Sequence, residues 1–384
     1  MSLPHHADVV IIGGGCVGAS VAYHLAQRGV KNILLEREKF LGMGSTRAAA
    51  GGVRYQFSTR VNVQLSIYSL DIIQHFAELF GISAAYKPIG YLFLLSNENH
   101  ARAFKQNLGL QQSLGVDARW VSVEDIARLA PRVNLDGIIG GTFGARDGLA
   151  DPNSITDGFA RAAARFGARI ETETAVTNIS RDARGIAAVT TTRGEIATRT
   201  VVCCAGAWSA EIGKMLGVEI PIVPLRRQFF ITDPIPHIPR DHPFTIEFST
   251  SFYFHPDGDA LVVGMSNHAE TPGYKFAVDE NFRAQTLAHA LTRVPALADA
   301  RIAHEIVGLY EATPDAHPIL SGVKNAPGFF IAAGFSGHGF MHSPATGKVM
   351  SEIILDGRSK TIDVSMLDYD RFAERRLIVE GNVV

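Results

Sequence analysis

The sequence has little cysteine and no long apolar segment. Its 384 residues contain three cysteines, Cys16, Cys203 and Cys204. Two of them are adjacent, which fits neither a disulfide framework nor the ligand spacing of a metal site, so we expect a reducing cytoplasm and no metal. The apolar stretch 9–23 follows Asp8, is interrupted by glycines, and is shorter than the ~18 apolar residues of a membrane span. We therefore expect neither a signal peptide nor a membrane anchor.

The sequence also lacks an excess of either charge. It has 36 basic and 38 acidic side chains, a formal net charge of −2, and no basic block. A nucleic-acid partner is therefore not expected. Hydrophobic residues make up 46% and charged residues 19%, a composition typical of a folded protein, and the length suggests two or three domains.

The N-terminal segment has the pattern of a strand, a helix and a second strand. A β-branched run at 8–12 leads into glycines, a helical pattern covers 16–28, and a second apolar run covers 32–35. The residues 61–80 predict one long amphipathic helix. Near the other end of the chain, 329–333 reads as a buried strand that precedes a helix near 343–355. Further helices are expected near 98–114, 123–129 and 157–166, and a strand near 200–205.

Proline and aromatic residues concentrate in the middle of the chain, a composition typical of antiparallel sheet. We therefore predict an α/β fold, with a Rossmann-type nucleotide-binding domain and an inserted mixed, largely antiparallel sheet domain for the substrate. The first domain is assigned to residues 1–83, 146–220 and 301–384, and the second to residues 84–145 and 221–300.

A glycine motif follows the first predicted strand and opens the first helix. It runs from Gly13 to Gly18, and Glu36 ends the next strand 18 residues later. Glycines let the backbone approach a pyrophosphate, the helix N-terminus faces its charge, and a carboxylate at this spacing binds ribose hydroxyls. The motif predicts a dinucleotide. An acidic residue at this position disfavours the 2′-phosphate of NADP.

Two further glycine-rich segments favour FAD over NAD. One covers 42–54, directly after the second strand, and the other covers 332–340, between a strand and a helix. The N-terminus of that last helix would stabilise negative charge on a reduced flavin ring, which a nicotinamide enzyme does not need.

Four ordered segments, 44–57, 204–208, 308–315 and 334–340, resemble the FAD-dependent amino-acid and amine oxidoreductases related to D-amino-acid, glycine and sarcosine oxidases. The resemblance extends over nearly the whole chain and is closest to the β subunits of sarcosine oxidase and proline dehydrogenase. It implies FAD, a carboxylate-bearing amine as substrate, hydride transfer to flavin N5, and an imine that hydrolyses.

The glycine motif and the resemblance together assign a set of residues to FAD binding. They are Gly13, Gly15, Cys16, Val17, Gly18, Glu36, Arg37, Gly44, Ser45, Thr46, Arg47, Gly51, Gly52, Val176, Ala205, Gly206, Trp208, Gly308, Gly334, Gly337, His338, Gly339, Phe340 and Met341.

The resemblance also implies four catalytic candidates. Arg54 matches the arginine that binds the substrate carboxylate in sarcosine-oxidase-like enzymes, and Tyr310 stands where glycine and D-amino-acid oxidases carry an arginine instead. Tyr253 is similar to an active-site tyrosine of the relatives, and His338 belongs to the last glycine-rich turn. Arg47 is expected to line the same pocket. No strong general base is needed if the amine binds in its neutral form.

Three departures from the relatives refine this expectation. Gly308 replaces the cysteine that links flavin covalently in monomeric sarcosine oxidase, so the FAD is expected to be non-covalent. Pro152 replaces the histidine that carries a second flavin, FMN, in the heterotetrameric enzyme. Val262 replaces a lysine that promotes oxygen reactivity, which favours a dehydrogenase weakly and leaves oxygen and an electron-transfer partner open as acceptors.

Several alternatives stay open at this point. The same scaffold could oxidise a 2-hydroxy acid or glycerol phosphate, or the chain could be a non-catalytic FAD subunit that works with partner chains. It could form a homo-oligomer or a hetero-oligomer with an α-type subunit. His338 and His342 could bind a metal or neighbour the flavin, and Arg226 and Arg227 could contact substrate or form salt bridges.

Overall fold

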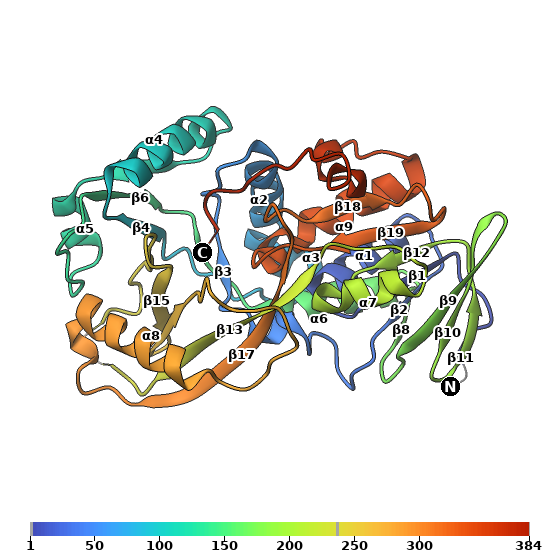
Figure 1. Ribbon diagram of the computed structural model, residues 1–384, viewed down its shortest axis with the longest axis horizontal. Helices are drawn as coiled ribbons and strands as arrows, with labels where there is room; N and C mark the ends of the chain where they lie inside the picture. The colour runs from blue at the N-terminus through green and yellow to red at the C-terminus, as the bar shows by residue number, and fades with distance from the viewer. Residues whose placement is uncertain (1–2, 236–237, 384) are drawn as a thin grey trace.

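The chain folds around two large sheets, one in each lobe of the computed structural model in Figure 1. The structure describes residues 3–235 and 238–383. The first sheet has six strands in the order β18-β19-β12-β1-β2-β8. All its neighbouring strands are parallel except β18 and β19. The strands are β1 (Val9–Ile12), β2 (Asn32–Leu35), β8 (Arg169–Glu171), β12 (Val201–Cys203), β18 (Ile319–Gly322) and β19 (Phe329–Ala333).

Both faces of this sheet are covered. Val9 and Ile11 of β1 pack in one core with the helices α1, α2, α6 and α9, whereas Val10 and Ile12 pack in another with a three-stranded sheet and α7. Because side chains alternate along a strand, burial on both sides explains the uninterrupted apolar run at 9–12. The covering elements are α1 (Cys16–Gln27), α2 (Arg60–Gln74), α6 (Pro152–Arg165), α7 (Ser209–Lys214), α9 (Gly339–Asp356), β9 (Val176–Asp182), β10 (Gly185–Thr191) and β11 (Gly194–Ala197).

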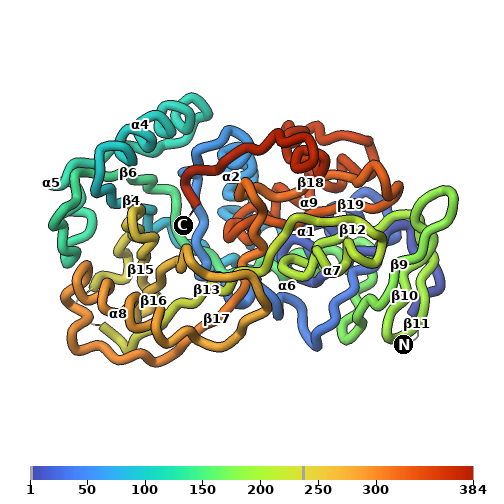
Figure 2. The backbone as a smooth tube through the Cα atoms, in the orientation of Figure 1, coloured from blue at the N-terminus to red at the C-terminus, as the bar shows by residue number. Residues whose placement is uncertain are grey.

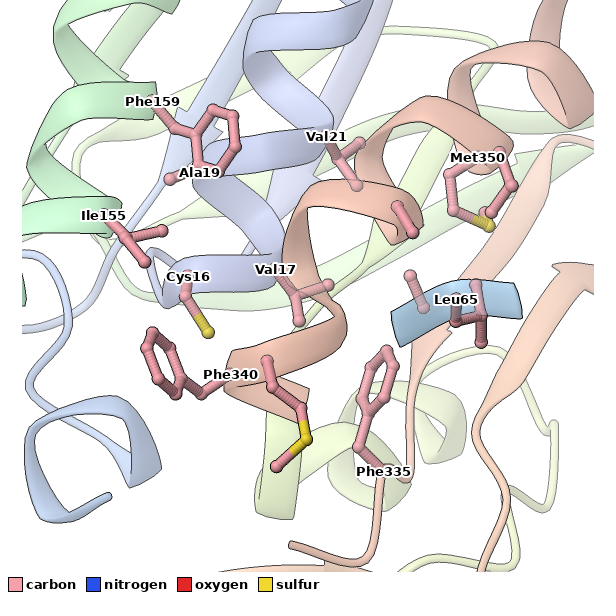
Figure 3. Packing of buried hydrophobic residues seen from close by; sticks show 14 of the residues in the cluster. Cys16, Val17, Ala19, Val21, Leu65, Ile155, Phe159, Phe335, Phe340 and Met350 are labelled. Atoms are coloured by element: carbon pink, nitrogen blue, oxygen red, sulfur yellow. The ribbon is translucent and has the colours of Figure 1, made fainter. Parts of the chain in front are cut away.

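Helix α1 lies between α6 and α9. Figure 3 shows Val17 and Val21 on the side of α1 that faces α9, and Phe159 of α6 beside Ala19. All four side chains are buried. This packing fixes the N-terminus of α1 beside that of α9, so the two predicted cofactor-facing helix ends are brought together.

The second sheet has eight strands in the order β17-β13-β16-β15-β14-β4-β6-β5. Its pairs are antiparallel except β14 with β4. The strands are β4 (Tyr91–Leu95), β5 (Ala118–Val121), β6 (Gly140–Gly144), β13 (Val223–Thr232), β14 (Phe244–Glu247), β15 (Phe252–Asp257), β16 (Ala260–Met265) and β17 (Ile302–Ala312). The helices of this lobe are α4 (Glu98–Ser113), α5 (Val123–Leu129) and α8 (Glu280–Arg293), and a two-stranded ribbon is formed by β3 (Gly52–Val53) and β7 (Gly148–Leu149).

The predicted fold class is confirmed, because a largely parallel sheet that follows the glycine motif is joined to a mixed, mostly antiparallel sheet. One expected boundary differs from the structure. The strand Ile302–Ala312 falls in the part assigned to FAD binding, yet it pairs along β13 in the eight-stranded sheet. Its backbone hydrogen bonds therefore join 302–312 to the predicted substrate domain.

The six helices that the sequence predicts are found, with three differences in their limits, whereas α7 and α8 lie where no helix was expected. The helix expected at 61–80 is divided at His75 into α2 and α3 (Phe76–Phe80), and Phe76 and Phe80 turn inward onto Phe159 of α6. α9 begins at Gly339, four residues before the expected start. α6 begins at Pro152 instead of 157, because Asp151 caps its first turn.

None of the helices within the described residues, 3–235 and 238–383, is both long and apolar enough to cross a membrane.

Candidate active site

A cavity of about 530 Å³ lies where the two sheets meet. The β1–α1 turn and the N-terminus of α9 form part of its wall, and side chains of β13, β15 and β17 form another part. The volume is in the range of ~300–1,000 Å³ that is usual for small-molecule sites.

The β1–α1 turn brings its backbone close to this cavity. Gly13 has a φ of +111°, and a Cβ atom there would lie 2.3 Å from the Cys204 carbonyl oxygen. Gly15 precedes the first turn of α1, which has neither a side-chain cap nor an acidic residue. An open helix N-terminus lined by glycine backbone is suited to a pyrophosphate group. The residues present therefore fit a dinucleotide.

Glu36 directly follows β2 and lines this part of the cavity. One of its carboxylate oxygens accepts a hydrogen bond from the Gly14 backbone N–H at 2.8 Å, and the other accepts one from the Glu38 N–H at 2.9 Å. Beside it, the Arg37 guanidinium lies 4.0 Å from the ring centroid of Trp208. A carboxylate held in this way can still accept hydrogen bonds from ribose hydroxyls through its remaining lone pairs.

Arg54 lies in another part of the cavity wall and is 5% exposed. Its Nη1 donates to the Gln56 carbonyl and its Nη2 donates to the Asn382 carbonyl at 2.7 Å. The guanidinium carbon lies 4.0 Å from the centroid of the Phe57 ring. Burial lowers the pKa of Arg54, but an arginine keeps its proton in such surroundings. The cavity therefore contains a held cation suited to a carboxylate.

Three tyrosines also line the wall; Tyr91 is buried, and Tyr253 and Tyr310 are half-buried. They come from different strands, Tyr91 from β4, Tyr253 from β15 and Tyr310 from β17. Burial raises the pKa of each phenol, most strongly for Tyr91 and Tyr253. All three remain protonated near neutral pH and can donate a hydrogen bond or pack against an apolar group.

The whole chain can be compared with known proteins. The sequence family described as "FAD dependent oxidoreductase" matches residues 8–353. The chain belongs to this family. Mouse mitochondrial sarcosine dehydrogenase is 31% identical over 96% of the chain, and mouse mitochondrial dimethylglycine dehydrogenase is 29% identical over 96%. The chain covers 42% and 44% of these two relatives, and so spans less than half their length.

Solved structures of the family extend the comparison. L-Proline dehydrogenase from P. horikoshii superposes with a TM-score of 0.91 at 33% identity, covering 98% of this chain and 100% of the other. Glycine oxidase from Geobacillus kaustophilus gives 0.85 at 25% identity, covering 96% and 99%. The expected family of FAD-dependent oxidoreductases and the FAD cofactor are confirmed.

Most residues assigned to FAD binding are brought to one wall. The exceptions are Gly18, Arg47 and Gly334, which do not line the cavity. Gly18 packs the helix on the strand, since a Cβ atom there would lie 1.9 Å from the Gly13 carbonyl oxygen. Gly334 has a φ of +88° and shapes its turn. Arg47 is exposed, so the structure does not place it in the pocket as expected. The residues that do line the cavity are Gly13, Gly15, Cys16, Val17, Glu36, Arg37, Gly44, Ser45, Thr46, Gly51, Gly52, Val176, Ala205, Gly206, Trp208, Gly308, Gly337, His338, Gly339, Phe340 and Met341.

The wall also contains residues that the sequence did not single out. Tyr91 and Phe229 belong to strands of the eight-stranded sheet and had no motif around them. Glu311 lies within the segment 308–315 that carries the family resemblance, and this position could have been noticed as an acidic residue in an apolar strand.

Glu311 is a half-buried residue near the cofactor motifs. One of its oxygens accepts a hydrogen bond from the Gly334 N–H at 2.8 Å. Burial raises its pKa to about 7, and hydrogen bonds from the Gly334 and Phe335 backbone oppose that rise. Asp147, which accepts hydrogen bonds from the Tyr55 N–H and Gln56 Nε2, also has its pKa raised by burial to about 7. Both groups titrate in the neutral range.

His338 and His342 lie side by side, with their ring centroids 5.1 Å apart. Burial lowers the pKa of both, to about 3 for His342, so both rings are neutral. His342 pairs with the Ser66 hydroxyl at 2.9 Å, whereas His338 Nε2 is buried without a partner among the described residues. A cofactor or substrate atom in the cavity could satisfy that nitrogen. Within the described chain, no group of three side chains could hold a metal ion.

The three cysteines are buried in the cores. Burial raises the pKa of Cys16 and of Cys203 to about 11, and it raises that of Cys204 further. Thiols of this kind are unreactive, so the cysteines act here as small core residues.

The neighbouring arginines of β13 differ in their surroundings. Arg226 forms salt bridges of 2.8 Å with both Glu270 and Asp279. Arg227 lines the cavity, with its guanidinium carbon 4.8 Å from the Tyr310 ring centroid. The sequence left both substrate contact and salt-bridge formation open for each arginine. In the structure Arg226 forms the salt bridges and Arg227 lines the cavity.

Proposed function

We propose that the chain oxidises the carbon–nitrogen bond of a small amino acid or secondary amine of the sarcosine, proline or glycine type. The observation that carries this proposal is the buried guanidinium of Arg54 in the wall of the same cavity as the flavin-binding motifs. A carboxylate there would form charge-assisted hydrogen bonds. The names of the relatives, which refer to sarcosine, dimethylglycine, proline and glycine, support this substrate class.

The cofactor fits this chemistry. When bound, FAD supplies a two-electron acceptor for the hydride at flavin N5. Arg54 would orient the substrate by its carboxylate, and one carboxylate oxygen would compete with the Asn382 carbonyl for Nη2. Tyr253 and Tyr310 would enclose the substrate and exclude water, since both are half-buried and line the wall of the cavity.

Protons and electrons balance without a protein base. The substrate enters as the neutral amine after its ammonium proton has gone to water. Its C–H hydride leaves with two electrons, its N–H proton goes to solvent where the substrate nitrogen carries one, and an imine remains. Water then adds to the imine and releases the carbonyl compound and the shortened amine. His338 is neutral, so it can accept or donate one hydrogen bond at the site without adding charge.

The flavin is proposed to be held without a covalent bond. Gly308 stands where a covalent enzyme would carry cysteine, and a Cβ atom at this position would lie 2.5 Å from the Ala48 Cβ. The cavity wall therefore leaves no space for a side chain at position 308 unless Ala48 moves. Acid precipitation of the protein should leave all the yellow colour in the supernatant, and flavin retained in the pellet would contradict this.

The function can be tested by anaerobic titration of the purified protein with sarcosine, L-proline, glycine and other D- and L-amino acids. Loss of the visible flavin absorbance with one of them is the expected result. A yellow protein reduced only by 2-hydroxy acids, or by no small molecule at all, would contradict the proposal and favour a hydroxy-acid enzyme or a partner-dependent subunit. The rate of recolouring in air then distinguishes oxygen from an electron-transfer partner as acceptor.

A further inference from the structure

We propose that Arg227 is a second anion-binding residue of the substrate pocket, and that the substrate is a secondary amine with two carboxylates, one on each side of the nitrogen. This inference rests on the proposed function for the identity of the pocket. It adds a requirement that neither the family nor Arg54 imposes.

The strand pairing places Arg227 on the cavity face of the second sheet. In the register of β13, β16 and β15, Phe229 lies opposite Gly264, which in turn lies opposite Tyr253. Because side chains alternate along a strand, Arg227 shares a face with Phe229, whereas Arg226 is on the other face. Arg227, Phe229 and Tyr253 all line the cavity.

Arg227 has no ionic partner among the described residues. Its Nη1 donates to the Arg226 carbonyl at 3.0 Å, and its Nε is buried without an acceptor. The adjacent Arg226 has two carboxylates. A buried guanidinium donor without an acceptor is unfavourable, so the position of Arg227 is explained if a ligand in the cavity provides the anion.

The acidic side chains of the cavity wall do not neutralise it. Glu36, Glu38 and Glu211 belong to the six-stranded sheet and its connections, where the cofactor motifs lie. Glu311 adjoins Tyr310 along β17, so its side chain points to the opposite side of the strand and binds the Gly334 N–H. Near Tyr310 the pocket thus has two cations, and no acidic wall residue pairs with either of them in the described chain.

Arg54 and Arg227 both act on the same part of the pocket. Each lowers the pKa of the Tyr310 phenol, against the larger effect of burial, which raises it. A ligand beside Tyr310 therefore meets two positive charges. A monocarboxylate would satisfy one of them, whereas an N-(carboxyalkyl) amino acid would satisfy both and place its nitrogen between them.

The reaction of such a substrate balances in the same way as above. Bound FAD would supply the two-electron acceptor for the hydride of a carbon attached to both nitrogen and a carboxylate, the N–H proton would go to solvent, and water would hydrolyse the imine. The products are an amino acid and a 2-oxo acid.

Binding can be measured without turnover by two thioether analogues in which sulfur replaces nitrogen. Thiodiacetate has two carboxylates and (methylthio)acetate has one, and each is titrated into the FAD-bound protein while the visible flavin spectrum is recorded. We expect thiodiacetate to bind about tenfold or more tightly, as a charge-assisted contact implies. Arg227→Gln should remove this preference, and Arg227→Lys should keep part of it. Arg226→Lys, the matched control on the other face, should keep all of it.

Equal dissociation constants for the two analogues in the unaltered protein, no spectral change with either, or a preference that survives in Arg227→Gln would overturn the proposal. Loss of bound FAD in Arg227→Gln would identify a misfolded variant. In that case the two analogues are compared in Arg227→Lys, and a preference for thiodiacetate as strong as in the unaltered protein would overturn the proposal. If sarcosine or proline reduces the flavin but the analogues bind equally, the proposed function stands and this inference fails. If the analogues discriminate but no amine reduces the flavin, the proposed function fails instead.

Discussion

Nη2 of Arg54 donates a hydrogen bond of 2.7 Å to the carbonyl oxygen of Asn382, across 328 positions of the sequence. Figure 2 shows the C-terminal segment returning from the six-stranded lobe to end near α2, between the lobes. The guanidinium proposed to hold the substrate carboxylate is thus itself held by a backbone carbonyl of the tail. Val383 also lines the cavity.

Replacing Arg54 should impair recognition of the substrate carboxylate. We expect Arg54→Ala to lower kcat/KM by about 2–4 kcal/mol, roughly 30- to 1,000-fold, because a charge-assisted, bidentate contact is lost. Arg54→Lys should recover part of this loss through charge alone. The measurement is the anaerobic rate of flavin reduction against substrate concentration. An unchanged kcat/KM in Arg54→Ala would remove Arg54 from the substrate site.

Glu380 anchors the tail that reaches Arg54. Its carboxylate accepts hydrogen bonds from the backbone N–H and hydroxyl groups of Ser58 and Thr59 and from Asn62 Nδ2 at 3.0 Å. Glu380→Gln would place an amide donor against these donors, so we expect a loss of about 2–3 kcal/mol in the free energy of unfolding. We also expect a changed KM for carboxylate substrates.

Urea unfolding measures the Glu380 effect. Glu374→Gln is the control, because Glu374 is half exposed and pairs with Arg376 at the surface, where a change below about 0.5 kcal/mol is expected. Equal stability of the two variants would contradict the anchoring role.

The close approach of α1 to β1 depends on Gly18. A Cβ atom at Gly18 would lie 1.9 Å from the Gly13 carbonyl oxygen, so Gly18→Ala should displace the pyrophosphate turn and abolish FAD binding. Gly109→Ala, within α4, meets no atom within 4 Å and should keep FAD while gaining about 0.5–1 kcal/mol of stability. Flavin content after purification distinguishes the two variants. A fully yellow Gly18→Ala protein would contradict the close packing.

Glu311 should make stability depend on pH. Its pKa in the folded protein is about 7, above the ordinary 4.5, so the folded state retains a proton that the unfolded state has lost between these values. The carboxyl group therefore destabilises the folded protein progressively as pH rises from about 4.5 to 7. Glu311→Gln removes this effect, and relative to the unaltered protein it should gain about 2–3 kcal/mol at pH 8 but little at pH 4. Urea unfolding at the two pH values measures the gain, and an equal difference at both would show that Glu311 is already ionised when folded.

Much of the cofactor site could be predicted from the sequence because its determinants are local. The glycines from Gly13 to Gly18, with Glu36 at the end of the next strand, define a turn, a helix N-terminus and a carboxylate within one strand–helix–strand unit. The positive φ of Gly13 and the close approach of Gly18 to the Gly13 carbonyl favour glycine through geometry within this unit. The family could also be identified from the sequence, because each of the four segments that resemble it is a short, continuous stretch that contains a complete motif.

The substrate end depends on contacts that no local pattern contains. Arg226 and Arg227 have the same chemistry in sequence. Only the position of the cavity against one face of β13 separates the salt-bridged Arg226 from Arg227, which has no ionic partner in the part of the chain that the structure describes. The Arg54–Asn382 contact requires the C-terminal segment to return to the middle of the molecule. The sequence by itself thus determined the family, the cofactor and the strand–helix–strand unit at the N-terminus, because these follow from backbone sterics and short-range spacing. Only the tertiary structure decided which charges face the substrate, because that depends on how distant segments pack.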